Sequence, residues 1–366
     1  MQDKNVEFPL TESSQLYQQA LSLFEKTEQN HCHSAKVNGI NMAYLEFGTS
    51  DGIPLIWGHG SGGGRYELFM VQEELVEAGY RVISIDYRGH GKTQLEVTPY
   101  NASLYHIADD IAALMDHLDL PKAIIGGLSK GGWIAAAFYD AYPGRCLGLL
   151  LEDGGSFSHL RLAEDVKLNL VQPIAASKTV TAEVSQKLYD SSTLFNSQIE
   201  GLKVAWQGGI APYSDSRQQA LNTDVRFWVI LLSHLRKVDG RWAPHCDVID
   251  LMYGNDAGRN ANDELLLSKT LYSRLPIMQR SQELMDPLVV FRNLHVPLHI
   301  IDPDSPTTLL QVHHQNEELQ QLHPDLIVHE PYTYEHSPHV AHIERPERFI
   351  KSAKAILTRV KQHHKL

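Results

Sequence analysis

The sequence is poor in cysteine, and the few it has are far apart. Its 366 residues contain three, at Cys32, Cys146 and Cys246. Three distant cysteines cannot form the paired framework that stabilises small secreted domains, so we expect a reducing compartment and a cytoplasmic protein. The first 14 residues also lack the basic start and apolar centre of a signal peptide, so we expect none.

Positive charge and long apolar runs are scarce as well. Lys and Arg total 32 against 44 Asp and Glu, which gives a formal net charge of −12. A negative surface repels phosphate groups, and this argues against nucleic acid or an anionic membrane as the main partner. No stretch approaches the roughly 18 uncharged apolar residues of a transmembrane helix, so we expect no membrane span. With 43% hydrophobic and 21% charged residues, the chain has an ordinary globular composition.

Strand and helix patterns alternate in two parts of the chain, residues 36–155 and 294–366. Mostly apolar runs such as Lys122–Leu128 and Cys146–Glu152 are separated by helical patterns of about 10–15 residues. Fully apolar strands that alternate with helices are typical of a parallel sheet covered on both faces. The two parts therefore predict one α/β core with a mostly parallel sheet.

Two further segments interrupt or precede this core. Residues 156–293 lose the alternation and show helical patterns instead, which predicts a helical cap inserted into the core. One apolar stripe in this insertion predicts a single helix through Val225, Trp228, Val229, Leu232 and Leu235. Residues 1–35 contain a short apolar stripe at helical spacing and are expected to form an N-terminal helical appendage.

The sharpest motif is Gly127-Leu128-Ser129-Lys130-Gly131, a G-x-S-x-G sequence. A buried strand leads into it and a helix rich in small residues leads out. A serine at such a turn takes up a strained backbone, and its hydroxyl projects beside the N-terminus of the helix. That terminus carries a positive partial charge, which suits a developing oxyanion. The motif in this context predicts that Ser129 is a nucleophile.

A glycine-rich turn follows the earlier strand, in Trp57-Gly58-His59-Gly60-Ser61-Gly62-Gly63-Gly64. It lacks the terminal G-K-[S/T] of a phosphate-binding P-loop, so we do not expect a nucleotide there. Such a turn can bring backbone N–H groups towards the serine hydroxyl. We therefore expect an oxyanion hole made by the backbone N–H groups of Ser61 and Lys130.

Four segments in order resemble the α/β-hydrolase fold family of lidded serine hydrolases. They are the His59–Gly64 turn, the stretch Asp86-Tyr87-Arg88-Gly89-His90-Gly91-Lys92-Thr93, the serine motif, and His339-Val340-Ala341-His342-Ile343-Glu344-Arg345-Pro346. The resemblance covers roughly residues 36–155 and 294–360. It implies an α/β-hydrolase fold and a Ser-acid-His triad that needs neither a metal nor an organic cofactor.

The resemblance also implies the position of the triad histidine and the regions that could supply the acid. Counting back from Glu344-Arg345-Pro346 places the catalytic histidine at His339, although His336 and His342 lie close to it. Three nearby loop histidines could instead bind a metal, but no Cys or carboxylate set at ligand spacing accompanies them. The acid is expected after the strand near residues 296–301, where we favour Asp304 over Asp302. Asp153, at the end of an earlier strand, is a third candidate.

These residues predict hydrolysis of a small-molecule carboxylic ester, or of a thioester, lactone or amide, through an acyl-enzyme. Two alternatives stay open, because a fold does not fix a function. One is C–C bond hydrolysis or peroxidase-like chemistry on the same triad. The other is a receptor that keeps the fold and binds a ligand without catalysis.

Overall fold

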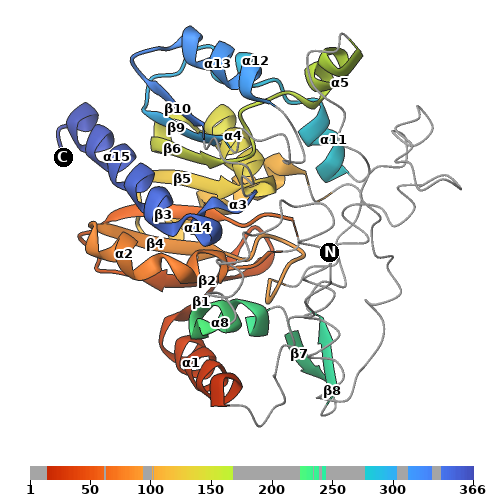
Figure 1. The fold of residues 1–366 in the computed structure, drawn as a ribbon, viewed down its shortest axis with the longest axis vertical. Coiled ribbons are helices and arrows are strands. Elements are labelled where there is room, and N and C mark those ends of the chain that lie inside the picture. Colours follow the sequence, from red (N-terminus) through yellow and green to blue (C-terminus); the bar gives the residue numbers. More distant parts are fainter. Residues whose placement is uncertain are drawn as a thin grey trace, which may run out of the picture.

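The structure is a computed structural model that describes residues 15–61, 63–93, 101, 103–167, 223–233, 235–238, 241–244, 277–302, 312–331 and 339–366 (Figure 1). The strands are β1 Cys32–Val37, β2 Ile40–Phe47, β3 Ile53–Gly58, β4 Tyr80–Ile85, β5 Ala123–Leu128, β6 Cys146–Glu152, β7 Leu235–Val238, β8 Arg241–Pro244, β9 Leu298–Asp302 and β10 Ile327–Pro331. The helices are α1 Gln15–His31, η1 Glu67–Met70, α2 Gln72–Glu77, α3 Leu104–His117, α4 Lys130–Ala141, η2 Pro143–Arg145, α5 His159–Lys167, α8 Val225–Ser233, α11 Ile277–Glu283, α12 Pro287–Val290, α13 His313–Leu322, α14 Ala341–Glu344 and α15 Pro346–His364.

An eight-stranded sheet with the order β1-β2-β4-β3-β5-β6-β9-β10 forms the centre of the fold. β1 and β2 are antiparallel to their neighbours, whereas the pairs from β4 to β10 are parallel. Every residue of β5 and β6 is buried, as expected for apolar strands covered on both faces. The α/β fold predicted from the sequence is confirmed.

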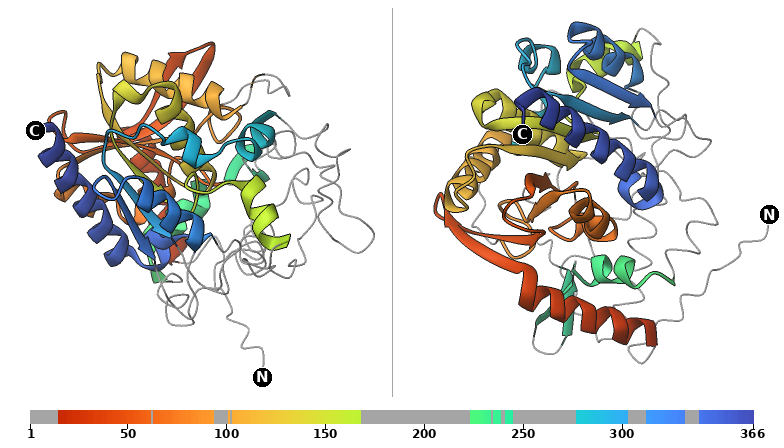
Figure 2. Two further views of the ribbon diagram at one scale, coloured as in Figure 1. Left: turned by 90° about the horizontal axis from the view of Figure 1, so that it is seen from above. Right: turned by 90° about the vertical axis from the view of Figure 1, so that its left-hand side faces the viewer.

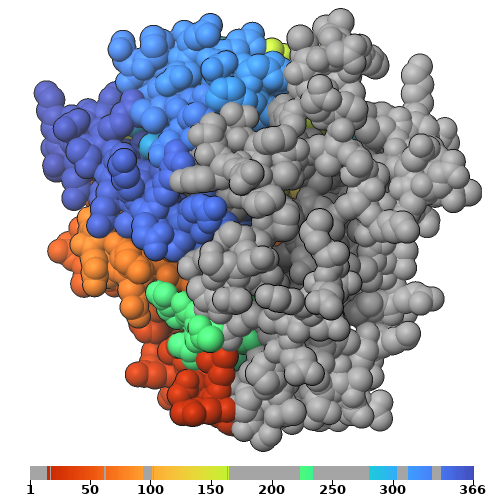
Figure 3. All heavy atoms as spheres, viewed as in Figure 1, coloured from red at the N-terminus to blue at the C-terminus, as the bar shows by residue number. Residues whose placement is uncertain are grey.

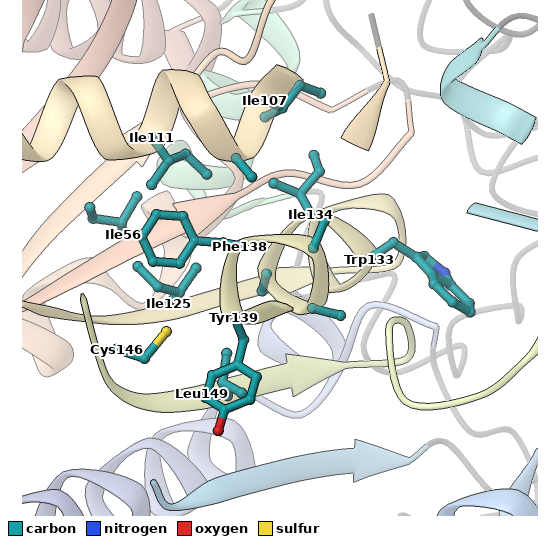
Figure 4. Packing of buried hydrophobic residues seen from close by; sticks show 14 of the residues in the cluster. Ile56, Ile107, Ile111, Ile125, Trp133, Ile134, Phe138, Tyr139, Cys146 and Leu149 are labelled. Atoms are coloured by element: carbon teal, nitrogen blue, oxygen red, sulfur yellow. The ribbon is translucent and has the colours of Figure 1, made fainter. Parts of the chain in front are cut away.

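Helices cover both faces of the sheet, and each face has its own apolar core. On one face α3 and α4 pack over the central strands, and Figure 4 shows Ile107, Ile111, Ile134 and Phe138 of these helices above Ile125 of β5. On the other face α2, α14 and α15 pack with η1 (Figure 2). The carboxyl ends of β3, β5, β6 and β9 therefore meet at one edge, between the two helical layers.

The stripe predicted as one helix through Leu235 is shorter in the structure. α8 ends at Ser233, and Leu235 begins β7, which pairs with β8 as an antiparallel hairpin. The predicted helical insertion thus also contains two short strands, β7 and β8, that the sequence analysis did not predict. The buried side chains of α8 include Trp228 and Leu232, and they pack against α1 and η1, at the end of the molecule where Figure 3 shows α1 and α8 side by side.

The N-terminal segment is joined to the sheet rather than set apart from it. α1 leads directly into β1, and β1 pairs with β2 from Cys32 to Val37, so this strand crosses the predicted boundary at residue 35. None of the helices in the described ranges combines the length and the apolar character needed to cross a bilayer.

Candidate active site

Ser129 occupies the turn between β5 and α4 with an unusual backbone. Its φ of 49° and ψ of −112° lie outside the ordinary regions for a residue with a side chain. A Cβ atom on Gly131 would collide with the carbonyl oxygen of Gly58, so only glycine lets α4 approach β3 this closely. Backbone strain of this kind costs about 1–3 kcal/mol and persists where the surrounding packing enforces it. The half-buried serine is thus held at the N-terminus of α4.

Asp153 occupies the equivalent turn on the next strand. Leu128 of β5 pairs with Glu152 of β6, so Ser129 and Asp153 follow at the same level of two adjacent parallel strands. Asp153 also has a positive φ, 46°. The backbone N–H of Ser129 donates to the carbonyl oxygen of Glu152 over 2.8 Å. The two strained turns are therefore locked to each other by the sheet.

The His339 side chain is hydrogen-bonded to Asp153. Its Nδ1 lies within hydrogen-bonding distance of Asp153 Oδ2, and the two side chains are 13% and 6% exposed. Burial alone would lower the pKa of His339, but the charge and hydrogen bond of Asp153 outweigh burial and raise it above 6.5. A carboxylate that holds Nδ1–H leaves the other ring nitrogen, Nε2, able to act as a base.

The structure describes Asp302, another of the expected site residues, and leaves two others undescribed. Asp304 and His336 lie outside the described residues. Asp302 is the last residue of β9, is buried, and accepts a hydrogen bond from Asn316 Nδ2 over 2.9 Å. Its carboxylate also lies 2.7 Å from His329 Nε2. Burial would raise the pKa of Asp302, but hydrogen bonds from its neighbours lower it to about 2.

The turn after β3 is held by a buried carboxyl group that sequence reasoning missed. Glu67 accepts hydrogen bonds from the backbone N–H of Gly60 and from Trp57 Nε1, both over 2.8 Å. Its burial raises its pKa to about 7. Glu67 therefore fixes the turn that carries Ser61. The oxyanion hole made by the backbone N–H groups of Ser61 and Lys130 stays a prediction.

Comparison with known proteins agrees with the fold. The profile of a family described as the alpha/beta hydrolase fold matches residues 53–177. The solved structure of a thermophilic esterase from Thermogutta terrifontis aligns with a TM-score of 0.55 and 21% identity, over 90% of this chain and 98% of that chain. The chain therefore has the α/β-hydrolase fold.

Curated relatives match only part of this chain. A non-heme chloroperoxidase from Streptomyces lividans is 36% identical over 109 residues, which are 30% of this chain and 39% of the relative. 3-Oxoadipate enol-lactonase 2 from Acinetobacter baylyi is 33% identical over 109 residues, which are 28% of this chain and 39% of that protein. The chain thus spans about two fifths of the length of these relatives.

A buried ion-pair network connects the glycine-rich turn to the first helix, α1. Arg65 follows the turn, and its guanidinium lies 2.6 Å from Asp86 Oδ2 and also pairs with Glu28 of α1. Asp86 accepts a further hydrogen bond from the backbone N–H of Lys92 over 2.9 Å. Asp86 thus has a structural role, because it holds Arg65 and the backbone of Lys92. Through Glu28, α1 also contributes to holding the glycine-rich turn.

The Lys130 side chain is buried under the insertion. Its Nζ donates to Gln282 of α11, and Gln282 Nε2 lies 2.7 Å from His159 Nε2. Burial lowers the pKa of Lys130 to about 7, although the charge of Glu283 opposes this. The residue beside Ser129 is therefore in direct contact with the segment expected to form the cap.

A second buried pair lies behind the triad candidates. His342 Nδ1 lies 2.7 Å from Glu152 Oε2, and the backbone N–H of His342 donates to Glu152 Oε1 over 3.0 Å. Both side chains are at most 1% exposed. This pair ties α14 to the end of β6, next to Asp153. The charged residue that ends the otherwise apolar strand Cys146–Glu152 is the sequence signal that could have revealed it.

Proposed function

We propose that this protein is a serine hydrolase that cleaves a carboxylic ester, lactone, thioester or amide of a small molecule. The observation that supports this most is the bond between His339 and Asp153, beside a strained Ser129 at the start of a helix. A nucleophile, a base and an acid that orients the base are the three parts of a serine hydrolase triad. In this proposal Asp153, at the end of β6, is the acid.

In the proposed mechanism His339 Nε2 takes the hydroxyl proton of Ser129 as Oγ attacks the substrate carbonyl carbon. Asp153 keeps the other proton on Nδ1 and stabilises the imidazolium that forms. The tetrahedral intermediate collapses, His339 gives its proton to the leaving alcohol, and an acyl-Ser129 ester is left. A water molecule, activated by the same His339, then releases the carboxylic acid and restores the serine.

The negative oxygen of the intermediate would be held by the backbone N–H groups of Ser61 and Lys130. Gly58 of β3 pairs with Gly127 of β5, and each proposed donor follows three residues after its paired glycine. The N-terminus of α4 adds its positive partial charge at the same place. Loss of one oxyanion-hole donor in other enzymes typically costs about 10²–10³ in kcat.

Residues 156–293 would act as a cap that shapes the substrate pocket. Two described contacts support this part of the proposal. Gln282 of α11 contacts Lys130 next to the serine, and Phe157, just after β6, packs edge-on against Trp133 of α4 with ring centroids 5.1 Å apart. We assign α8 no part in the pocket, because its buried side chains pack with α1 and η1.

The test is covalent labelling combined with ester hydrolysis. A fluorophosphonate probe should label the wild type once, and Ser129→Ala should lose both the label and about 10⁶ of kcat on p-nitrophenyl esters. Ser233→Ala is the matched control, because among the described residues its hydroxyl donates to the carbonyl oxygen of Ile230 within α8. If Ser129→Ala kept activity within tenfold of wild type, the serine hydrolase proposal would fail, and an unlabelled wild type would favour a non-catalytic receptor.

A further inference from the structure

A second cluster of chemically reactive side chains lies at the ends of β9 and β10. Asp302 ends β9, His329 lies within β10, and His313 is the first residue of α13. The three elements adjoin one another at one side of the sheet, as Figure 1 shows. Of the residues that the structure describes, these form the only group of three His, Cys, Asp or Glu whose ligand atoms converge.

The spacing of the converging atoms is close to that of a metal site. Asp302 Oδ2 lies 2.7 Å from His329 Nε2 and 3.3 Å from His313 Nδ1, and all three atoms lie within 4.8 Å of one another. A tetrahedral Zn²⁺ with bonds of about 2.0–2.1 Å holds its ligand atoms about 3.3 Å apart. Binding would therefore require the aspartate and His329 to separate by only a fraction of an ångström.

The surroundings of the cluster also resemble those of a metal centre. His313 turns its other nitrogen, Nε2, to Glu317 Oε1 at 3.2 Å, one helical turn further along α13. Histidines that bind metals usually donate their second ring N–H to a carboxylate in this way, which fixes the tautomer of the ring. The carboxylate that orients His313 is thus already in place.

Asn316 supplies an independent indication. Its Nδ2 donates to Asp302 Oδ2 over 2.9 Å, while its Oδ1 is buried without a hydrogen-bond partner in a residue that is 1% exposed. A buried amide oxygen without a partner costs free energy and calls for an explanation such as a bound water or ion. Among the described residues, the cluster therefore contains a hydrogen-bond acceptor, Asn316 Oδ1, that no protein group satisfies.

We propose that Asp302, His313 and His329 bind one divalent transition-metal ion, for which Zn²⁺ fits the donor set best. Two imidazole nitrogens and one carboxylate oxygen are ligands that Zn²⁺ accepts, and three protein ligands leave a fourth position for water or another donor. The bound ion would link the ends of two adjacent strands to the start of α13. This site departs from the sequence-based expectation of no metal, and it shares no residue with the proposed triad.

The experiment measures Zn²⁺ binding to the full chain, without an affinity tag and stripped of metal by a chelator. Calorimetric titration should give one ion per chain, and Co²⁺ should give the visible absorption of a tetrahedral complex. His329→Gln should weaken Zn²⁺ binding by at least about 10²-fold, and Glu317→Gln by about 10–100-fold. His314→Gln, one residue from His313 on the same helix, is the matched control and should bind as the wild type does.

Two variants, Glu317→Gln and Ser129→Ala, make the Zn²⁺ binding experiment decisive. If His329→Gln fails to fold, Glu317→Gln decides, because Glu317 is 54% exposed and its replacement leaves the core unchanged. Ser129→Ala should bind Zn²⁺ normally, so that failure of the hydrolase proposal does not affect this one. The proposal is overturned if the wild type binds no ion, if His314→Gln weakens binding as much as His329→Gln, or if a folded Glu317→Gln binds as tightly as wild type.

Discussion

Replacement of Asp153 by asparagine tests the proposed triad most directly. The amide has nearly the same shape as the carboxylate but carries no charge, so the turn after β6 should keep its geometry. An amide N–H facing His339 Nδ1 would hold the imidazole in the tautomer with its proton on Nε2, which cannot accept the serine proton. The analogous change in a known triad lowers kcat about 10⁴-fold. At 1.36 kcal/mol per tenfold, this is about 5 kcal/mol of lost transition-state stabilisation.

The structure indicates that this loss should come from catalysis rather than from unfolding. Burial raises the pKa of Asp153, an effect that His339 opposes and that the nearby carboxylates of Asp302 and Glu152 increase. Asparagine removes this buried charge and its repulsion. We therefore expect the melting temperature of Asp153→Asn to stay close to that of the wild type, while kcat collapses.

The assay is steady-state hydrolysis of p-nitrophenyl esters of graded chain length, with Asp302→Asn and Asp304→Asn measured beside Asp153→Asn. Asp302 is engaged by Asn316 and His329, so its variant should lose far less kcat than Asp153→Asn. Asp304→Asn should remain within tenfold of wild type. If Asp304→Asn is the crippled variant and Asp153→Asn works normally, Asp153 is not the acid, although the serine hydrolase proposal survives.

Three further predictions concern pH and packing. The value of kcat/KM should rise with pH with a midpoint above 6.5, because His339 must be neutral to act as a base and Asp153 raises its pKa. In Asp153→Asn this midpoint should move to lower pH. A wild-type midpoint below 6.5 would contradict the prediction. Gly131→Ala should lower the free energy of unfolding by at least about 3 kcal/mol in urea titration, because its methyl group meets the Gly58 carbonyl; an unchanged midpoint would refute the close approach. Trp228→Ala should cost about 3–5 kcal/mol of stability, because the indole is fully buried, while kcat of the folded protein stays unchanged; a selective loss of kcat would instead place α8 at the substrate pocket.

The sequence predicted the central part of the fold because its signals there are local. β6 has the predicted limits, Cys146–Glu152, since its apolar run ends at clear turn residues. Ser129 could be singled out for the same reason: its strand, its glycines and its helix are consecutive in the chain. The position of His339 came from its spacing to a recognisable sequence segment.

The acid and the insertion depend on contacts that no local pattern contains. Whether Asp153 or a later aspartate faces His339 depends on which strands are neighbours and on what else binds the candidates. Asp302 lies close to His329, which is 27 residues away in the chain. Leu235 continues the apolar spacing of a helix, but its backbone pairs with Pro244 in a hairpin, and this tertiary pairing overrides the local pattern.

The packing of α1 on α8 has a consequence for the order in which this chain can fold during synthesis. α1 ends at His31, but the helix that covers its apolar side ends at Ser233. At about 5–20 residues per second, the ribosome needs on the order of 10–40 s to make the intervening chain. During that time the side of α1 that carries Ala20 lacks its final cover. A nascent chain of this protein should therefore offer chaperones an apolar helix early, and lose that binding site only when α8 emerges.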